Sequence, residues 1–430
     1  MITEFPNGLT LIYEKSKHKL PLSVIEVYCN IGSIDEPPDL KGVAHLIEHM
    51  VFKGTKSHPT ASSIFEVSIG SDFNAYTDKT LTCYYMKCLD NNLGKCLNIL
   101  SDMMFHSFFH KIDFKKERDV VKEENIKNAD DLESILNEEI ESLIFKNTEY
   151  DLPIDTLSYH GKNALPLKRV YDYYKTHYVP SNIVISIYSN VLYSTVMSYL
   201  QKSYFFSEPN SKQPNSKQPN GKQPNKKRFF QSLLNVSAEK PSFKQIKKDS
   251  LTTYIAIGFK TCSYDNEDRY ALEIFETVLS GGMNSYMFTL LRDKNGLTYT
   301  SGVDTNFYNT IGSFTLYAEV DKRKVMKNGE KKGVLPLMIQ MIRYFVKHGI
   351  TKKQLTDAKT ILMEEHIRSL EDTETVAEHN GLEYLLKSNS LIVPYDQVFR
   401  MKYKPITVEQ INVVIRRYFT DKQMNICLVG

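Results

Sequence analysis

The sequence predicts an α+β protein of two homologous αβ-roll domains, each a mainly antiparallel sheet covered by helices, joined by a polar linker. A polar five-residue repeat divides the 430-residue chain into two segments of similar size. The two segments also show strand-like and helix-like patterns in the same order, which indicates an internal duplication. Since 41% of the residues are apolar, both segments have enough hydrophobic side chains for a core of their own.

The boundary between the domains is compositional. From Pro209 the chain reads PNSKQ, PNSKQ, PNGKQ and PNKK, without an apolar side chain. Burial cannot offset the entropy that such a segment loses on ordering, so we expect a linker. We therefore predict a first domain over residues 1–205, a low-complexity linker over 206–244 and a second domain over 245–430.

The elements of the first segment follow from its turns and apolar spacings. An Asn-Gly turn at residues 7–8 precedes an alternating strand, and Gly70 ends a helical pattern. The expected elements are strands over 9–13 and 22–29, a helix around His45, a helix over 59–70, a hairpin over 73–86 that turns at residues 78–79, and a long acidic helix over about 113–141.

The second segment repeats this order. We expect a strand over 254–259, a helix over 269–279, a Gly-Gly-Met-Asn-Ser turn at 281–285, a helix to Arg292, strands over 298–303 and 314–320, further helices and a final strand over 425–430. Strands and helices that recur in the same order support the α+β duplication.

Charge and composition exclude several functions. The formal charge is only +3, from 54 basic and 51 acidic residues, which gives no global field for nucleic acid or an anionic membrane. No apolar run approaches the roughly 18 residues of a transmembrane helix, and the first residues resemble neither a secretory signal nor a transit peptide. The six cysteines form no CxxC pair. We expect a water-soluble protein of the cytoplasm, with no nucleic-acid or membrane partner.

Two histidines one helical turn apart are the clearest chemical feature. Residues 45–49 read His-Leu-Ile-Glu-His within the apolar spacing of an amphipathic helix. His45 and His49 then project from the same face, with Glu48 beside them. Two imidazoles at this spacing can bind one Zn²⁺, and the carboxylate can hold a water molecule at the metal. The alternative is two polar-face histidines and an ordinary helix glutamate.

A zinc site requires a third protein ligand, and the acidic run ERDVVKEE offers candidates. Glu117 and Glu124 are seven residues apart, so they share a helix face, and we expect Val120 and Val121 on the inward side with them. Carboxylates at the apolar edge of a helix require a cation or a donor. The alternative is a solvated charge run.

Three ordered blocks, GVAHLIEHMVFKGT, GSDFNAYTDKTLTCYY and ERDVVKEE, resemble the pitrilysin, insulysin and mitochondrial processing peptidase family of inverted zincins, and most closely its short-chain branch. The resemblance covers nearly the whole chain. It implies one Zn²⁺ per chain, held by His45, His49 and Glu124, with Glu48 as the general base for a metal-activated water.

The resemblance also makes Glu117 the supporting carboxylate of the site. Glu123 is the rival of Glu124 as the third ligand because the two residues are adjacent. The seven-residue step from Glu117 is the spacing of the family and keeps both carboxylates on one helix face, whereas a six-residue step turns Glu123 away.

Substrate contacts are implied in both segments. The strand with Asn74 and Ala75 matches an exposed edge strand that pairs with the substrate backbone in this family. The second segment has no HxxEH, and its helix reads Ala-Leu-Glu-Ile-Phe at 271–275. Arg292 and Tyr299 match a pair that hydrogen-bonds the substrate near the scissile carbonyl, where such donors stabilise an oxyanion.

The implied function is that of a zinc metalloendopeptidase that hydrolyses peptides or unfolded polypeptide segments in an enclosed chamber. The alternative is a non-catalytic structural or interaction subunit of the same fold. Since this one chain carries both the zinc motif and the Arg/Tyr pair, we expect a homodimer. A heterodimer with an inactive partner is the second possibility.

Overall fold

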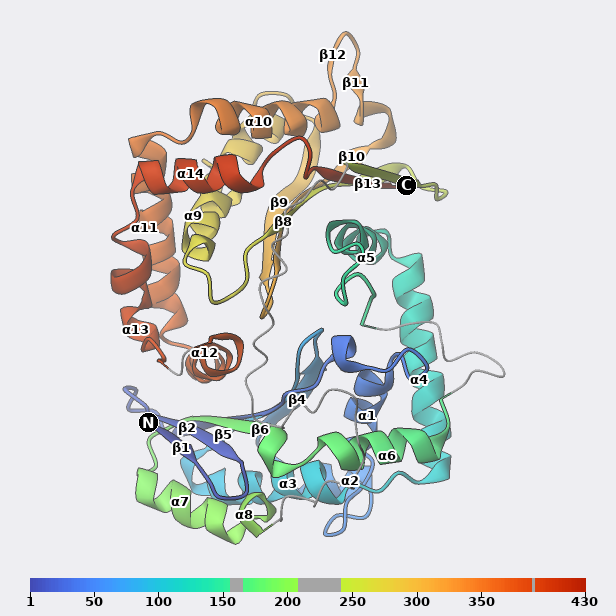
Figure 1. Cartoon of the computed structure of the whole chain (residues 1–430), viewed down its shortest axis with the longest axis vertical. Helices are drawn as coiled ribbons and strands as arrows, with labels where there is room; N and C mark the ends of the chain where they lie inside the picture. Colours follow the sequence, from blue (N-terminus) through green and yellow to red (C-terminus); the bar gives the residue numbers. More distant parts are fainter. Residues whose placement is uncertain (155–164, 208–240, 389–390) are drawn as a thin grey trace. The chain divides into compact units, whose positions relative to one another are not determined.

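The computed structural model describes residues 1–154, 165–207, 241–388 and 391–430. They form two compact units, each built around one large sheet (Figure 1). Unit 1 comprises Met1–Ile126, Leu152–Phe229 and Ser369–Tyr395, and unit 2 comprises Lys127–Asp151, Phe230–Arg368 and Asp396–Gly430. This architecture confirms the predicted α+β fold of two sheet-and-helix domains. The repeat that predicted the linker lies outside the described residues.

The sheet of unit 1 has six strands in the order β1-β2-β6-β3-β5-β4. Among these described strands, β2 and β6 pair in parallel and the other neighbours pair antiparallel. The strands are β1 (Ile2–Glu4), β2 (Thr10–Lys15), β3 (Leu22–Cys29), β4 (Asp72–Thr77), β5 (Thr82–Leu89) and β6 (Ile183–Ser189). The helices are α1 (Val43–Val51), α2 (Ala61–Val67), α3 (Leu93–His106), α4 (Lys111–Asp130), α6 (Leu167–His177), α7 (Tyr193–Lys202), α8 (Tyr204–Ser207) and α12 (Thr373–Leu386).

Both faces of this sheet are covered, as the central strand β3 shows. Ile25, Val27 and Cys29 belong to the main core with the helices of the first half of the sequence. The alternate residues Val24 and Tyr28 belong to smaller clusters with residues of α12. A strand that packs on both sides reads as a continuous apolar run, which is why Leu22–Cys29 was recognisable in the sequence.

The large sheet of unit 2 has the order β7-β13-β8-β10-β9, with β7/β13 as its parallel pair. The strands are β7 (Ser242–Ile246), β8 (Thr252–Thr261), β9 (Thr298–Phe307), β10 (Gly312–Asp321) and β13 (Asn425–Val429), and a separate hairpin has β11 (Lys327–Asn328) and β12 (Lys331–Lys332). The helices include α5 (Leu132–Ile144), α9 (Asp268–Ser280), α10 (Val334–His348), α11 (Lys352–Ser369), α13 (Tyr395–Val398) and α14 (Val408–Tyr418). The five strands match β2-β6-β3-β5-β4 in order and direction, which confirms the duplication.

The units are assembled from interleaved segments rather than from contiguous halves. Helix α12, from the second half of the sequence, packs on β3 and β6 of unit 1, and α5, from the first half, packs on β8 and β13 of unit 2. The boundaries 1–205 and 245–430 therefore differ from the structure at residues 127–151 and 369–395. The expected linker over 206–244 also includes the start of β7 at Ser242.

The long acidic helix is in fact two helices. Helix α4 ends at Asp130 and α5 begins at Leu132, because the side chain of Asp131 accepts a hydrogen bond from the amide of Ser134 and caps α5. The boundary at Asp131 was not predicted because charged residues continue on both sides of it. The expected helix to Arg292 is a π-helical turn over Phe288–Asp293.

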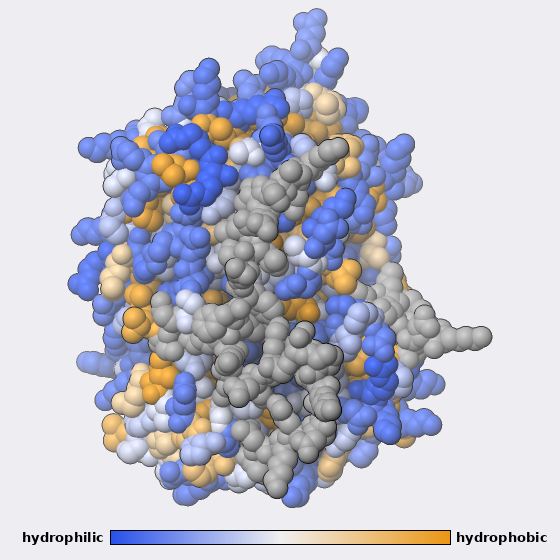
Figure 2. Space-filling view, in the orientation of Figure 1, coloured by the Kyte–Doolittle hydropathy of each residue, from blue (hydrophilic) through white to orange (hydrophobic). Residues whose placement is uncertain are grey.

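Hydrophilic residues predominate on the face shown in Figure 2, and the hydrophobic residues are dispersed among them. Among the described residues, no helix combines the length and the apolar composition needed to cross a lipid bilayer.

Candidate metal centre and active site

Helix α1 presents the histidines because its opposite face is buried. Leu46, Ile47 and Met50 are fully buried in the core of unit 1. The buried carboxylate of Glu36 accepts hydrogen bonds from the amides of Gly42 (2.7 Å) and Ala44 (2.8 Å), which fixes the start of the helix. The partly exposed face is left for the residues of the His-x-x-Glu-His motif.

Helix α4 brings its carboxylates to α1 along one partly buried face. Phe114, Glu117 and Val121 are buried on this face, and Glu124 follows one turn further on. Val120, expected on the inward side, is instead 42% exposed, because it lies about 100° around the helix from Val121.

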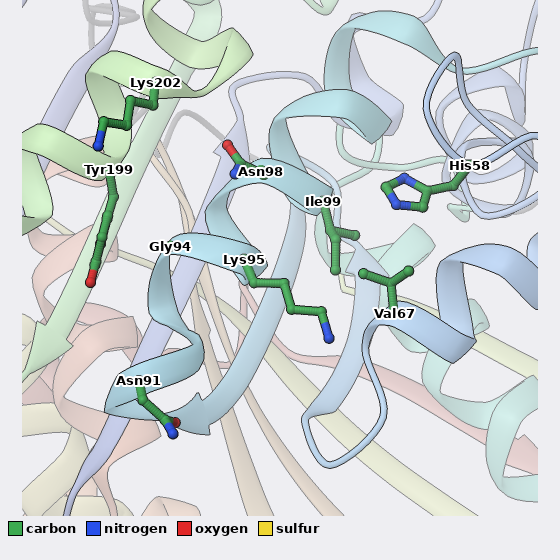
Figure 3. Close-up of a pocket in the computed structure, with 9 residues that line it drawn as sticks. All are labelled: His58, Val67, Asn91, Gly94, Lys95, Asn98, Ile99, Tyr199 and Lys202. Atoms are coloured by element: carbon green, nitrogen blue, oxygen red, sulfur yellow. The ribbon is translucent and has the colours of Figure 1, made fainter.

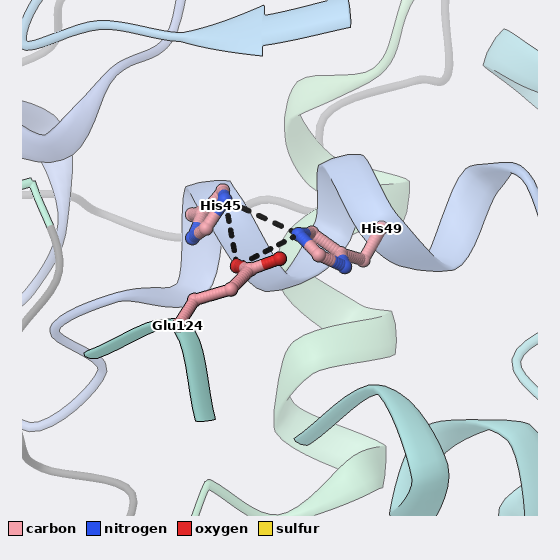
Figure 4. Close-up of side chains that lie close together, drawn as sticks. All are labelled: His45, His49 and Glu124. Carbon is pink, nitrogen blue, oxygen red and sulfur yellow. Dashed lines mark hydrogen bonds and ion pairs between the residues drawn. The ribbon is translucent and has the colours of Figure 1, made fainter. Parts of the chain in front are cut away.

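His45, His49 and Glu124 form a compact group of possible metal ligands (Figure 4). The Nε2 atoms of the two histidines are 3.2 Å apart, and Glu124 Oε2 lies 3.6 Å from that of His49 and 4.0 Å from that of His45. Tetrahedral zinc with bonds of about 2.0–2.1 Å requires donor atoms about 3.3 Å apart. Two nitrogen donors and one oxygen donor at these distances fit zinc, and three protein ligands are the number that catalytic zinc sites use. Glu123 is not part of this group.

The second nitrogen of His49 has its own partner. Its Nδ1 lies 3.1 Å from Glu117 Oε2, so the ring donates there and directs the lone pair of Nε2 toward Glu124 and His45. Burial of Glu117 opposes ionisation, but hydrogen bonds from His49 and Lys53, together with the charge of Lys53, lower the pKa of Glu117. Glu117 is therefore an anionic acceptor for His49.

Glu48 is held from the edge of the sheet. The hydroxyl of Thr77, at the end of β4, donates to Glu48 Oε2 at 2.5 Å. This hydrogen bond fixes the orientation of the Glu48 carboxylate next to the histidines of the same helix. This geometry suits a general base beside a metal group.

Asn74 and Ala75 lie on β4, the edge strand of the sheet next to β5. The amide of Ala75 donates to the side-chain oxygen of Asn74 at 2.9 Å. Because β4 is the last strand in the order of this sheet, its outer edge is the place where an extended peptide could add as a further strand.

Arg292 and Tyr299 lie together in unit 2. The guanidinium group of Arg292 donates to the carbonyl oxygen of Tyr299 at 3.3 Å and lies 4.8 Å from the centre of its ring. Tyr299 is 81% exposed, so its hydroxyl is accessible to a ligand. Arg292 and Tyr299 are thus brought together as a pair of donors.

A separate cavity of about 510 Å³ lies on unit 1 beside α3 and α7 (Figure 3). His58 and Ile99 line it together with residues that include Lys95 and Tyr199. None of its lining residues belongs to the metal group or to the β4 edge. This cavity is therefore separate from the candidate metal group.

Three residues of the centre were not recognised in the sequence. Glu36 caps α1, Thr77 holds Glu48, and Lys53 contacts Glu117 at 2.8 Å. Thr77 and Lys53 are part of the blocks that carry the family resemblance, so their place in these blocks was a signal for them. Glu36 gave no signal, because it lies six positions before the N-cap residue Gly42 and its contact depends on the path of the loop between them.

Two units of one topology, one of which carries a His-x-x-Glu-His helix beside a carboxylate helix, define a two-domain α+β protein with a candidate zinc centre. Residues 11–156 match the family described as Insulinase (Peptidase family M16), and residues 164–362 match the Peptidase M16 inactive domain. The chain belongs to peptidase family M16, the insulinase and pitrilysin family, in its short two-domain form.

Relatives of similar length carry zinc-protease names. The chain is 28% identical over 429 residues to "Uncharacterized zinc protease YmxG" of Bacillus subtilis, which covers 96% of this chain and 94% of the relative. It is also 28% identical over 401 residues to an "Uncharacterized zinc protease" of Rickettsia felis, covering 89% and 87%.

Solved structures share the fold. A protease from Helicobacter pylori superposes with a TM-score of 0.86 at 21% identity, over 100% of this chain and 99% of that one. A structure titled peptidase M16 inactive domain, from Pseudomonas fluorescens, gives 0.83 at 17% identity, over 100% and 97%. The periplasmic protease PqqL of Escherichia coli gives 0.76 at 16% identity, over 100% of this chain and 47% of PqqL.

Proposed function

We propose that this chain is a zinc-dependent metalloendopeptidase that hydrolyses peptides or unfolded polypeptide segments in an enclosed chamber. The observation that carries the proposal is the group of His45, His49 and Glu124 at distances suited to tetrahedral zinc, with Glu48 on the same helix. The names of the relatives support this function at the level of the family.

Each residue has a defined task in this proposal. His45, His49 and Glu124 hold one zinc ion, which when bound supplies the Lewis acidity that makes water a usable nucleophile at neutral pH. Glu48 accepts a proton from the attacking water and returns it to the leaving amine. Thr77 fixes the carboxylate of Glu48 for both transfers.

The free edge of β4 supplies the binding mode. A substrate backbone paired with Asn74 and Ala75 would be recognised by its amide groups rather than by its side chains, which suits a tolerant peptidase. Arg292 and Tyr299 are proposed to donate hydrogen bonds to the developing oxyanion. Glu117 positions His49 and takes no proton from the substrate.

We propose a homodimer in which the second domain of each chain completes the zinc site of its partner. The support is that the zinc motif and the Arg292/Tyr299 pair occur on one chain. A heterodimer is the alternative. The cytoplasm is the proposed compartment, because the six cysteines are dispersed without a CxxC pair.

The function is tested with Glu48→Gln, which keeps the size of the side chain and removes its basicity. We expect about one zinc per chain in both proteins by metal analysis, and cleavage of a quenched peptide library that falls by about 10²–10⁴-fold in the variant.

Glu66→Gln, which alters a glutamate of α2, is the matched control and should cleave as the wild type does. Zinc bound in full with no cleavage of any peptide by the wild type would favour the non-catalytic subunit, a possibility raised by the inactive-domain description of residues 164–362. A wild type that binds no zinc would contradict the site itself.

A further inference from the structure

We propose that Lys53 is a positioning residue of the zinc site, which holds Glu117 so that Glu117 in turn orients His49. The inference rests on the proposed zinc site, and it concerns a residue to which the family resemblance gives no role. Its starting point is a chain of two contacts. Lys53 Nζ lies 2.8 Å from Glu117 Oε1, and His49 Nδ1 lies 3.1 Å from Glu117 Oε2.

The two oxygens of Glu117 have separate partners. With Oε1 bound by an ammonium group and Oε2 by an imidazole, the plane of the carboxylate is fixed from both sides. If Lys53 were absent, Glu117 could rotate about its last torsion and still bond His49 through either oxygen. Lys53 therefore prevents a rotation of the Glu117 carboxylate that would allow the ring of His49 to change its orientation.

The backbone holds Lys53 where this contact requires it. Lys53 lies just beyond the end of α1, and from there its ammonium group reaches the same carboxylate of α4 as the ring of His49 does. Its amide donates to the carbonyl of Met50 at 3.1 Å, and the carbonyl of Gly54 accepts from Phe108 at 2.8 Å. An ammonium group at the end of α1 is also favoured by the helix dipole.

Charge gives a second reason for a cation at this position. The carboxylates of Glu48, Glu117 and Glu124 carry three negative charges against the two positive charges of a zinc ion, and Lys53 restores neutrality. The side chain of Glu117 is only 9% exposed, so water cannot compensate its charge well, whereas Lys53 is 27% exposed. Removal of one partner from a largely buried ion pair costs far more than removal of a surface pair.

Lys53→Met keeps the length and the apolar stem of the side chain and removes its charge. Competition with a chelator of known affinity should show zinc affinity reduced by about 10–100-fold, the usual effect of losing a group that orients a metal ligand. Lys53→Arg should restore most of this affinity, since a guanidinium group can also bind a carboxylate. Lys56→Met, at an exposed lysine of the same loop, is the matched control and should bind zinc as the wild type does.

A double-mutant cycle separates positioning from a general structural effect. If Lys53 acts through Glu117, Lys53→Met should lower zinc affinity much less in a Glu117→Gln background than in the wild type. Equal losses in both backgrounds, or wild-type affinity in Lys53→Met, would overturn the inference. Thermal unfolding of the metal-free variants shows whether each is folded. A wild type that binds no zinc would instead contradict the proposed function.

Discussion

At the scale of single residues, the two units place one glutamate–threonine pair in equivalent positions. Glu48 on α1 accepts from Thr77 on β4 at 2.5 Å, and Glu276 on α9 accepts from Thr305 on β9 at 2.7 Å. In each pair the glutamate and the threonine are 29 positions apart in the sequence, and each pair joins a helix to the edge strand of its sheet in the same way. The counterpart of the His-x-x-Glu-His motif in unit 2 is thus residues 273–277, not the expected 271–275.

The positions beside Glu276 that correspond to His45 and His49 carry no histidine, so this part of α9 offers no imidazole ligand. Residues 273–277 read Glu-Ile-Phe-Glu-Thr, which offers no pair of imidazoles. Burial, aided by nearby carboxylates that include Glu273 and Asp304, raises the pKa of Glu276 to about 7 against the hydrogen bond from Thr305. Below about pH 7 the neutral acid is therefore the major form of Glu276 in the folded protein.

This raised pKa predicts a pH-dependent stability. The pKa of Glu276 in the folded protein is higher than its ordinary value near 4.5. The contribution of the neutral Glu276 to the free energy of unfolding is therefore fully present below about pH 4.5 and is lost as pH rises through about 7. Glu276→Gln should match the wild type near pH 4 and exceed its free energy of unfolding by up to about 3 kcal/mol near pH 8. Urea denaturation at both pH values measures this difference.

Glu364→Gln is the control for this measurement, because the side chain of Glu364 is 61% exposed. Its effect should be below about 0.5 kcal/mol at either pH. A Glu276→Gln variant that follows the pH dependence of the wild type would show that Glu276 does not titrate differently on folding.

At the scale of elements, α12 and α5 are the helices whose packing partners were not predicted from the sequence. Each approaches its sheet at a glycine. A β-carbon on Gly381 of α12 would lie 2.3 Å from the ring of Tyr28 on β3, and one on Gly258 of β8 would lie 2.4 Å from Ile144 of α5. Both glycines permit a close contact between a helix and a strand that are far apart in the sequence.

Gly381→Ala should destabilise unit 1 although residue 381 belongs to the second half of the chain. Alanine favours a helix by about 1 kcal/mol over glycine, but overpacking against the fully buried Tyr28 costs about 1–3 kcal/mol. Hydrogen-exchange mass spectrometry should show faster exchange in β3 and β6, with β8 and β13 unchanged.

Gly258→Ala is the reciprocal variant and should loosen β8 and β13 instead. Its effect should be smaller, because the atom that it meets is the flexible end of Ile144. If Gly381→Ala loosened only the sheet of unit 2, the assignment of α12 to unit 1 would be wrong.

At the scale of the whole molecule, neither half of the sequence contains a complete unit. Residues 127–151 complete unit 2 and residues 369–395 complete unit 1. A fragment that ends before residue 369 lacks the helix that covers Val24 and Tyr188 on the sheet of unit 1. The two units therefore depend on one continuous chain.

The proposed dimer gives a prediction at this scale. Glu48→Gln and Arg292→Ala chains are each expected to be nearly inactive. After subunit exchange, mixed dimers pair one intact zinc site with one intact Arg292 from the partner chain, so about a quarter of wild-type activity should return. Mass measurement of differently tagged chains verifies the exchange. A mixture that stays inactive despite exchange would exclude the proposed arrangement in trans.

Local signals were sufficient for much of the fold and of the candidate site. The apolar run of β3 and the helical spacing around His45 indicated the two central elements, and the seven-residue step from Glu117 favoured Glu124 over Glu123. These features depend on neighbours within a few residues of each other. The boundary at Asp131 was missed because a charge run continues across it, although Asp131 is a standard capping residue.

Periodicity and motif spacing are local properties, so the amino-acid sequence was sufficient to predict the duplicated α+β architecture and the family. The residues of the candidate metal group were predicted from the same motifs together with the family resemblance. The exchange of α5 and α12 between the units became visible in the folded chain, as did the contact of Thr77 with Glu48 and the sharing of the Glu117 carboxylate by Lys53 and His49. Such contacts join residues 29 to several hundred positions apart, so they depend on how the helices pack on the sheets rather than on the sequence around each residue.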